Sequence, residues 1–93
     1  QWPEELRADK EIMMGVVKQH GQYLHFASET LRNDREVVLT AVRNDGWALS
    51  FASDELKDDR DIVLAAIRNR GVSLVHASKR LRADRELVLV AVR

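Results

Sequence analysis

The sequence predicts an all-α protein, a short α-solenoid of about three and a half helix-pair repeats of 25 residues each. Three observations support this fold class. The chain repeats with a fixed period of 25 residues, each unit contains two segments with a helical spacing of apolar residues, and a glycine recurs where the first segment should end. Periods between roughly 20 and 50 residues are typical of stacked repeat architectures.

The repeat is defined by columns in which every complete unit carries the same residue. These columns are Leu6, Leu31, Leu56 and Leu81; Asp9, Asp34, Asp59 and Asp84; Gly21, Gly46 and Gly71; Leu24, Leu49 and Leu74; Ala27, Ala52 and Ala77; and Ser28, Ser53 and Ser78. They divide a single repeat domain, residues 1–93, into a partial unit 1–8, units 9–33, 34–58 and 59–83, and a partial unit 84–93. One helix pair cannot cover its own apolar faces, so we expect successive units to stack around a shared core.

The first segment of each unit is predicted to be a helix that begins after an aspartate. In the second complete unit the helix should run from Arg35 to about Asn44, because the Asp34 carboxylate can accept from the open amides of the first turn. The structural caps predicted in this column are Asp9, Asp34, Asp59 and Asp84. Gly46 is expected to end the helix in a left-handed conformation with positive φ. Apolar residues cover most of the helix circumference, so neighbours are expected on both sides.

The second segment is predicted to be one helix from Trp47 to about Lys57. One face of this helix carries Leu49, Ala52, Ser53 and Leu56. We expect the invariant alanine to let helices approach closely and the serine hydroxyl to bond back to a carbonyl one turn earlier. The serine is interpreted as structural, because a catalytic nucleophile is needed once and needs a base beside it.

A competing interpretation makes the valine-rich run VVLTAV a strand. Valine favours strands, and a period in the twenties also fits a leucine-rich repeat. Two features favour the helix instead. The run lies between an aspartate cap and an Arg-Asn-x-Gly ending, and the asparagine that leucine-rich repeats place after their strand is absent from the corresponding position.

Charge and composition limit the classes of partner. The 15 basic and 15 acidic residues balance, which gives no general attraction to phosphate backbones or anionic lipid. The net charge is −1 over residues 1–25, −4 over residues 26–65 and +5 over residues 66–93. We interpret these opposite charges as faces that meet neighbouring repeats or chains. A nucleic-acid contact through Arg80, Arg82 and Arg85 is the less favoured interpretation.

The sequence offers no candidate catalytic, cofactor-binding or metal site. His20, His25 and His76 fall in three different columns, and the chain has no cysteine and no His-Glu-x-x-His spacing to complete a zinc site. The longest apolar runs have six residues, against the roughly 18 to 20 that a membrane span needs. We therefore expect a protein that is not an enzyme, uses no cofactor and has no membrane span.

Partner binding is predicted where the copies differ. The columns beside the invariant glycine vary most and supply the candidates His20, Gln22, Tyr23, Trp47 and Arg70. Trp47 is the best candidate for an anchor, because an exposed aromatic ring supplies a large contact area. The alternative is that Trp47 closes its own helix start as a hydrophobic staple. The terminal layers are a second candidate surface, since no further unit covers the apolar residues Leu87, Val88, Val90 and Val92.

The stretch DREVVLTAVRNDGWALSFASDELKDD, which begins at Asp34, resembles the domain-of-unknown-function 4116 family of tandem helical repeats. The similarity extends over nearly the whole chain. The first unit departs most from the pattern, with Lys10, Met13, Met14, Gly15 and Val16 in place of the arginine, valine, leucine and alanine of the other units. The resemblance implies the fold and no agreed activity, catalytic residue or cofactor.

The expected function is a non-catalytic protein-interaction or scaffolding module, such as an accessory subunit of a larger assembly. Protein partners or neighbouring repeats would bind through the terminal layers and the Tyr23 and Trp47 edge. The alternative is a regulatory or effector segment of a longer multidomain protein.

Overall fold

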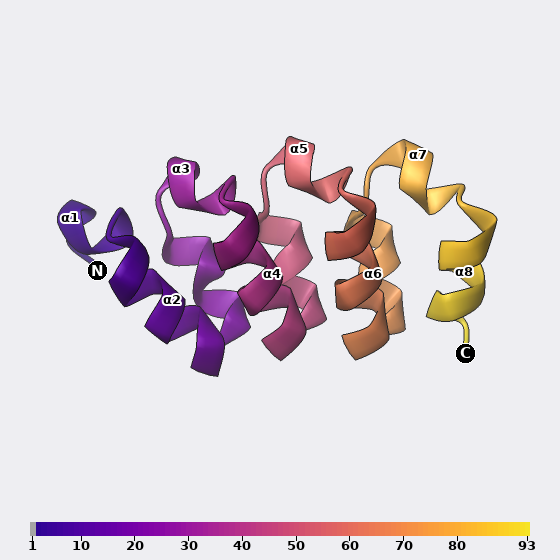
Figure 1. The fold of residues 1–93 in the computed structure, drawn as a ribbon, viewed down its shortest axis with the longest axis horizontal. Coiled ribbons are helices and arrows are strands. Elements are labelled where there is room, and N and C mark those ends of the chain that lie inside the picture. The colour runs from indigo at the N-terminus through magenta and orange to yellow at the C-terminus, as the bar shows by residue number, and fades with distance from the viewer. Residues whose placement is uncertain (1) are drawn as a thin grey trace.

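The structure, a computed structural model, describes residues 2–93 as a row of parallel layers. The long α-helices of the row are α2 (Lys10–Gln19), α4 (Arg35–Asn44), α6 (Arg60–Asn69) and α8 (Arg85–Ala91), and each lies against the next (Figure 1). The molecule is elongated along the row, with principal extents of 41 × 22 × 19 Å. Residues 2–93 contain no strand, so the prediction of an all-α repeat fold is confirmed and the leucine-rich alternative is wrong.

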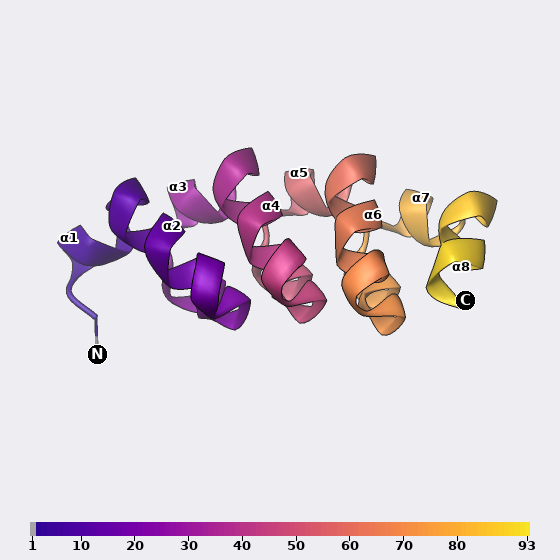
Figure 2. The same ribbon diagram turned by 60° about the horizontal axis from the view of Figure 1, so that its bottom comes forward.

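The long helices α2, α4 and α6 are each followed by a 3₁₀ segment and a short α-helix. The 3₁₀ segments η1 (Gly21–Phe26), η2 (Gly46–Phe51) and η3 (Gly71–His76) form a second row behind the long helices. The short helices α1 (Glu4–Arg7), α3 (Glu29–Arg32), α5 (Asp54–Lys57) and α7 (Lys79–Arg82) lie along one edge (Figures 1 and 2). The predicted single helix over 47–57 is therefore wrong, because extended backbone at Ala52 and Ser53 separates η2 from α5.

An aspartate side chain begins each long helix. Asp34 Oδ1 accepts from the amides of Glu36 at 3.0 Å and Val37 at 3.2 Å. The carboxylates of Asp9, Asp59 and Asp84 accept from first-turn amides in the same way. The helix after Asp34 spans Arg35–Asn44, the bounds expected from the sequence.

The invariant serines begin the short helices and do not bond back to a carbonyl as predicted. Ser53 Oγ accepts from the Leu56 amide at 3.2 Å, which makes Ser53 the N-cap of α5. Its own amide donates to the Arg32 carbonyl of the preceding unit at 2.9 Å. Ser28 and Ser78 make the equivalent pair of contacts. The serine is therefore a cap and a link between layers, because the extended backbone before α5 directs its hydroxyl to the first turn of that helix.

The invariant glycines are required by close packing and not by backbone conformation. Within residues 2–93 no residue has positive φ, and this includes the glycines. The predicted left-handed helix stop is therefore wrong. A Cβ added to Gly21 would overlap the carbonyl of Ala41 in α4, and one added to Gly46 would overlap that of Ala66 in α6. Each glycine thus lets the start of a 3₁₀ segment contact the backbone of the following layer.

Asparagine side chains complete the contact at the same place. Asn69 Oδ1 accepts from the amide of Gly46 at 2.7 Å, and Asn44 Oδ1 accepts from that of Gly21 at 2.7 Å. Asn44 Nδ2 also donates to the Lys18 carbonyl at 3.2 Å. The last residue of one α-helix therefore satisfies backbone groups of the layer before it, including the buried amides of Gly21 and Gly46.

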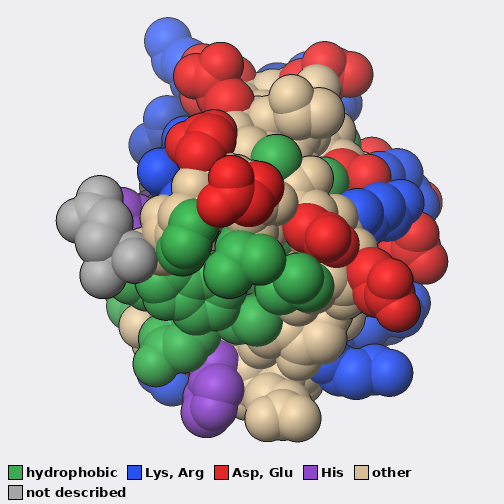
Figure 3. Space-filling view, turned by 90° about the vertical axis from the view of Figure 1, so that its left-hand side faces the viewer, with side chains coloured by type: hydrophobic (Ala, Val, Ile, Leu, Met, Phe, Trp, Pro, Cys, Tyr) green, Lys and Arg blue, Asp and Glu red, His purple; other side chains and the backbone are tan. Residues whose placement is uncertain are grey.

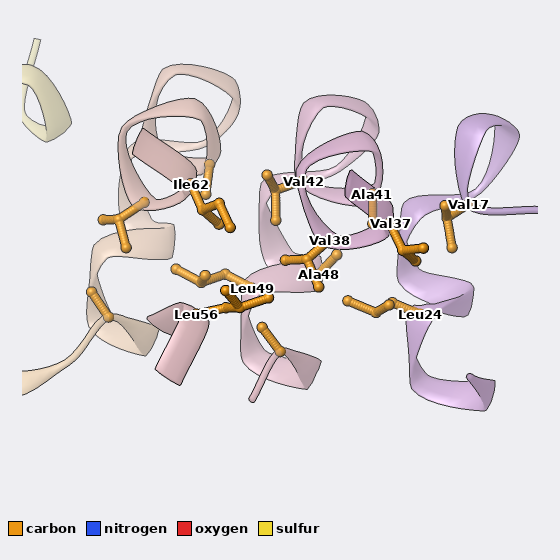
Figure 4. Packing of buried hydrophobic residues seen from close by; sticks show 14 of the residues in the cluster. Val17, Leu24, Val37, Val38, Ala41, Val42, Ala48, Leu49, Leu56 and Ile62 are labelled. Atoms are coloured by element: carbon orange, nitrogen blue, oxygen red, sulfur yellow. The ribbon is translucent and has the colours of Figure 1, made fainter. Parts of the chain in front are cut away.

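The core is a continuous row of aliphatic side chains between the two rows of helices (Figure 4). On α4 the buried side chains Val37, Val38 and Val42 contact both neighbouring layers, while Leu24 and Leu49 of the 3₁₀ segments close the core from the other side. Within residues 2–93 no helix has the length and apolar character needed to cross a membrane.

Candidate interaction surfaces

The candidate residues at the variable columns take part in three separate contacts. Gln22 Nε2 donates to Asp45 Oδ2 at 2.8 Å, and Arg70 Nε forms an ion pair with Asp45 Oδ1 at 3.1 Å. Both residues therefore join adjacent layers through Asp45, a residue that the sequence analysis did not single out. His20 is exposed, and its ring centroid lies 5.2 Å from that of Tyr23.

Trp47 lies apart from Tyr23 and contacts the following unit. Its half-buried ring meets the ring of His76 edge-on, with 4.9 Å between centroids. The burial of His76 lowers the pKa of its imidazole, and the ammonium of Lys57 lowers it further. One part of the Trp47 ring therefore stabilises the stack, and the remainder lines a shallow hollow on the surface.

Tyr23 belongs to an aromatic cluster at the N-terminal end of the row. Trp2 stacks on Phe26 with 5.8 Å between centroids and an interplanar angle of 4°, and it meets Tyr23 edge-on at 6.3 Å. Tyr23 and Phe26 are also edge-to-face at 5.6 Å. We call Trp2, Tyr23 and Phe26 the aromatic face. Seen end-on, the apolar surface at this end is continuous, with histidine and acidic side chains around it (Figure 3).

Comparison along the repeat columns explains why this end is exposed. Tyr23 is 41% exposed, whereas Ala48 and Ser73 in the same column are fully buried against the preceding layer. Leu6 and Ile12 show the same difference, since their counterparts in later units are buried. These columns therefore face the N-terminal side of every layer, and the first layer leaves them open to solvent.

The last layer leaves the opposite set of columns open. Val88 and Val92 of the final layer are exposed, Val92 at 74%, while Val38 and Val42 in the same columns are fully buried. Leu89 of α8 is also exposed. We call Val88, Leu89 and Val92 the C-terminal face. Of the four residues expected to be uncovered at this end, Leu87 is fully buried and Val90 is half-buried, because their side of α8 faces the preceding layers. The terminal layers are apolar at both ends, and they present different sides of the repeat.

A ladder of ion pairs runs along the row at the starts of the long helices. Each of three cations reaches two carboxylates of the next unit: Lys10 reaches Asp34 and Glu36, Arg35 reaches Asp59 and Asp61, and Arg60 reaches Asp84 and Glu86. The N–O distances lie between 2.9 and 3.3 Å. Hydrogen bonds to Glu36 and then to Asp34 raise the pKa of Lys10. The ladder therefore favours one register between successive units.

Two features of these surfaces were missed in the sequence. Trp2 stands in the column of the invariant alanines, and this substitution of a small residue by the largest one was a visible signal. The asparagine column, Asn44 and Asn69, is also visible in the repeat, but its role depends on a contact with the preceding layer. Among residues 2–93 no group of histidine, aspartate or glutamate side chains is arranged to hold a metal ion.

Comparison with known families agrees with the 25-residue period of the sequence. The family model described as Domain of unknown function (DUF4116) matches residues 1–32, 9–57, 34–82 and 59–93, and these overlapping matches together cover the chain. Comparisons with curated proteins and with solved structures gave no match. The starts at residues 9, 34 and 59 coincide with the aspartates that begin each unit. The chain therefore belongs to the DUF4116 family of helical repeats.

Proposed function

We propose that this domain is a non-catalytic protein-interaction or scaffolding module that binds a protein partner on its aromatic face. The observation that carries the proposal is a cluster of three aromatic rings on one end of the row, in which Tyr23 and Phe26 are exposed and Trp2 is half-buried. Tryptophan and tyrosine are enriched among the residues that supply most of the binding energy at protein interfaces. An apolar patch with polar residues around it is typical of such interfaces.

The framework beneath the aromatic face supports the same proposal. Tyr23 and Phe26 lie on η1, whose first amide is bonded to Asn44 and whose Gly21 packs against α4. A surface held in place before binding loses little conformational entropy when a partner binds. The module would thus present a rigid aromatic surface at one end of an elongated body.

The test is to replace the aromatic residues by those that later units carry in the same columns. Trp2→Ala and Tyr23→Ser introduce the alanine and serine found at Ala52 and Ser73, so the double variant is compatible with the repeat fold. Proteins cross-linked to the domain in cells that express it are then quantified by mass spectrometry. We expect the double variant to lose a specific partner that the Trp47→Ala variant retains. Unchanged recovery with the folded double variant would contradict the proposal, and loss through Trp47→Ala alone would move the site to the Trp47 edge.

A further inference from the structure

The ion-pair ladder is incomplete at both ends of the row, and its two open ends are complementary. Arg85 occupies the column of Arg35 and Arg60, but among residues 2–93 it has no carboxylate partner. Asp9 and Glu11 occupy the column positions of the accepting carboxylates, and no cation of the described chain pairs with them. The C-terminal end thus presents the unpaired cation, and the N-terminal end presents the unpaired carboxylates.

The apolar columns repeat this complementarity. Inside the stack, the column of Val88 and Val92 on one layer packs toward the following layer, which contributes the columns of Leu6 and Ile12. The C-terminal face presents the Val88 and Val92 columns of that interface, and the N-terminal end presents the Leu6 and Ile12 columns. The exposed side chains on the two ends are therefore of the kinds that already pack together between interior layers.

The two ends also differ in shape in a complementary way. The 3₁₀ segments η1, η2 and η3 follow α2, α4 and α6 and lie beside them, and among residues 2–93 no 3₁₀ segment follows α8. Val72 and Val75 of η3 are exposed at 58% and 62%. At the same level the N-terminal end carries the bulky rings of Trp2 and Tyr23, where interior units carry only alanine or serine. The large aromatic side chains thus lie where they would enter the space beside η3 if another row followed.

From these three observations we propose that a second copy of this chain stacks head-to-tail on the first. The C-terminal face of one copy packs against α2 and the aromatic face of the other, and Arg85 pairs with Asp9 and Glu11 of the second copy. This inference rests on the proposed function, since it names the partner of the aromatic face. Apolar contact supplies the attraction, and the exposed ion pairs mainly select the register, because each contributes little by itself. Such an interface is heterologous and leaves one end open, so association continues to longer rows as concentration rises.

The test is sedimentation of the purified 93-residue chain over a range of concentrations, with charge reversals at the two ends. The variants Arg85→Glu and Glu11→Arg each place like charges at the interface, so we expect each alone to associate about tenfold more weakly than wild type. Neither variant removes a helix cap, and a glutamate is favourable in the first turn of α8. Arg43→Glu is the matched control, because it makes the same charge change as Arg85→Glu at an exposed arginine in the middle of the row that itself forms no ion pair among residues 2–93. We expect the control to associate like wild type.

An equimolar mixture of the two variants gives the decisive measurement. The Glu11→Arg chain still has its Arg85, and the Arg85→Glu chain still has its Asp9 and Glu11. The C-terminal end of the first chain can therefore bind the N-terminal end of the second through the wild-type ion pairs, and the mixture should recover association with wild-type affinity as a mixed pair. A mixture that stays as weak as its components would overturn the head-to-tail arrangement, provided that circular dichroism shows both variants folded. Wild-type chain that remains a monomer up to millimolar concentration would overturn the inference as well. That result would leave the proposed function standing if cross-linking still recovers a different protein on the aromatic face.

Discussion

Replacing Gly46 with alanine tests whether the layers are held at contact distance by the absence of a side chain. The added Cβ would overlap the Ala66 carbonyl oxygen and lie 2.7 Å from Ser73 Oγ and 3.2 Å from the Ala66 carbonyl carbon. Ordinary contact begins at 3.4 Å. Because the obstructing atoms are mainly backbone, the two layers must move apart by roughly 1 Å, and such a gap forfeits about half of the dispersion energy across it.

The expected loss of stability is a difference between two effects. Overpacking of this kind costs about 3 kcal/mol at the upper end of its usual range. The alanine offsets up to about 1 kcal/mol of this loss by reducing the conformational freedom of the unfolded chain. A net loss of about 2 kcal/mol should lower the midpoint of thermal unfolding by roughly 10 °C for a domain of this size.

Gly15 provides a matched control in the same chain. It lies inside α2, and a Cβ built there has no neighbouring atom within 4 Å, so Gly15→Ala should stabilise the protein by about 0.5–1 kcal/mol. Urea denaturation followed by circular dichroism at 222 nm measures both variants. Gly46→Asn separates the two explanations of the glycine, since a left-handed site would tolerate asparagine better than alanine, and a crowded site would not. Equal stability of Gly46→Ala and wild type, or a better-tolerated asparagine, would refute the packing argument.

Three further predictions concern hydrogen bonds and titrating groups. Asn44→Ala should destabilise the fold by about 1–3 kcal/mol in urea denaturation, because the buried Gly21 amide loses its acceptor, and Asn44→Asp, which keeps an acceptor, should cost less. Burial alone would raise the pKa of Asp34, but hydrogen bonds from first-turn amides and the neighbouring Lys10 lower it below 3.8. The contribution of Asp34 to stability is therefore fully present above pH 3.8 and is lost as the pH falls through the lower pKa of the folded state. Asp34→Asn should therefore reduce the acid dependence of the urea midpoint, and an unchanged dependence would contradict this assignment. In a variant that lacks Trp2, so that Trp47 is the single tryptophan, protonation of the neighbouring His76 should quench the Trp47 fluorescence on acidification. The midpoint should lie below 6.5, because the pKa of His76 is lowered, and His76→Phe should remove the transition.

The parts of the fold that depend on neighbours in sequence could be predicted. The cap at Asp34 and the bounds of the helix after it follow from residues within a single turn of one another. The 25-residue register is a property of the sequence itself, and the family match agrees with it. These features need no knowledge of how the layers are arranged.

The second segment of the unit could not be predicted, because its backbone finds partners in other layers. A continuous helix over 47–57 would bond its amides internally, but the Ser53 amide donates instead to Arg32 of the preceding unit. The Gly46 amide is satisfied by Asn69, which lies 23 residues further along the chain. Contacts at that separation outweigh the local helical preference and leave a 3₁₀ segment, an extended link and a short helix.

The sequence by itself determined the all-α repeat, its period, its aspartate caps and the columns that pack, since each of these is a pattern along one chain. Only the tertiary structure decided which side of each column faces forward or backward in the row. The direction of stacking makes Tyr23 exposed and Ala48 buried in the same column, and it places Arg85 and Asp9 at opposite open ends. The physical reason is that a repeat covers its apolar faces only by contact with the layers beside it, so the exposure of any residue depends on where its layer stands in the row.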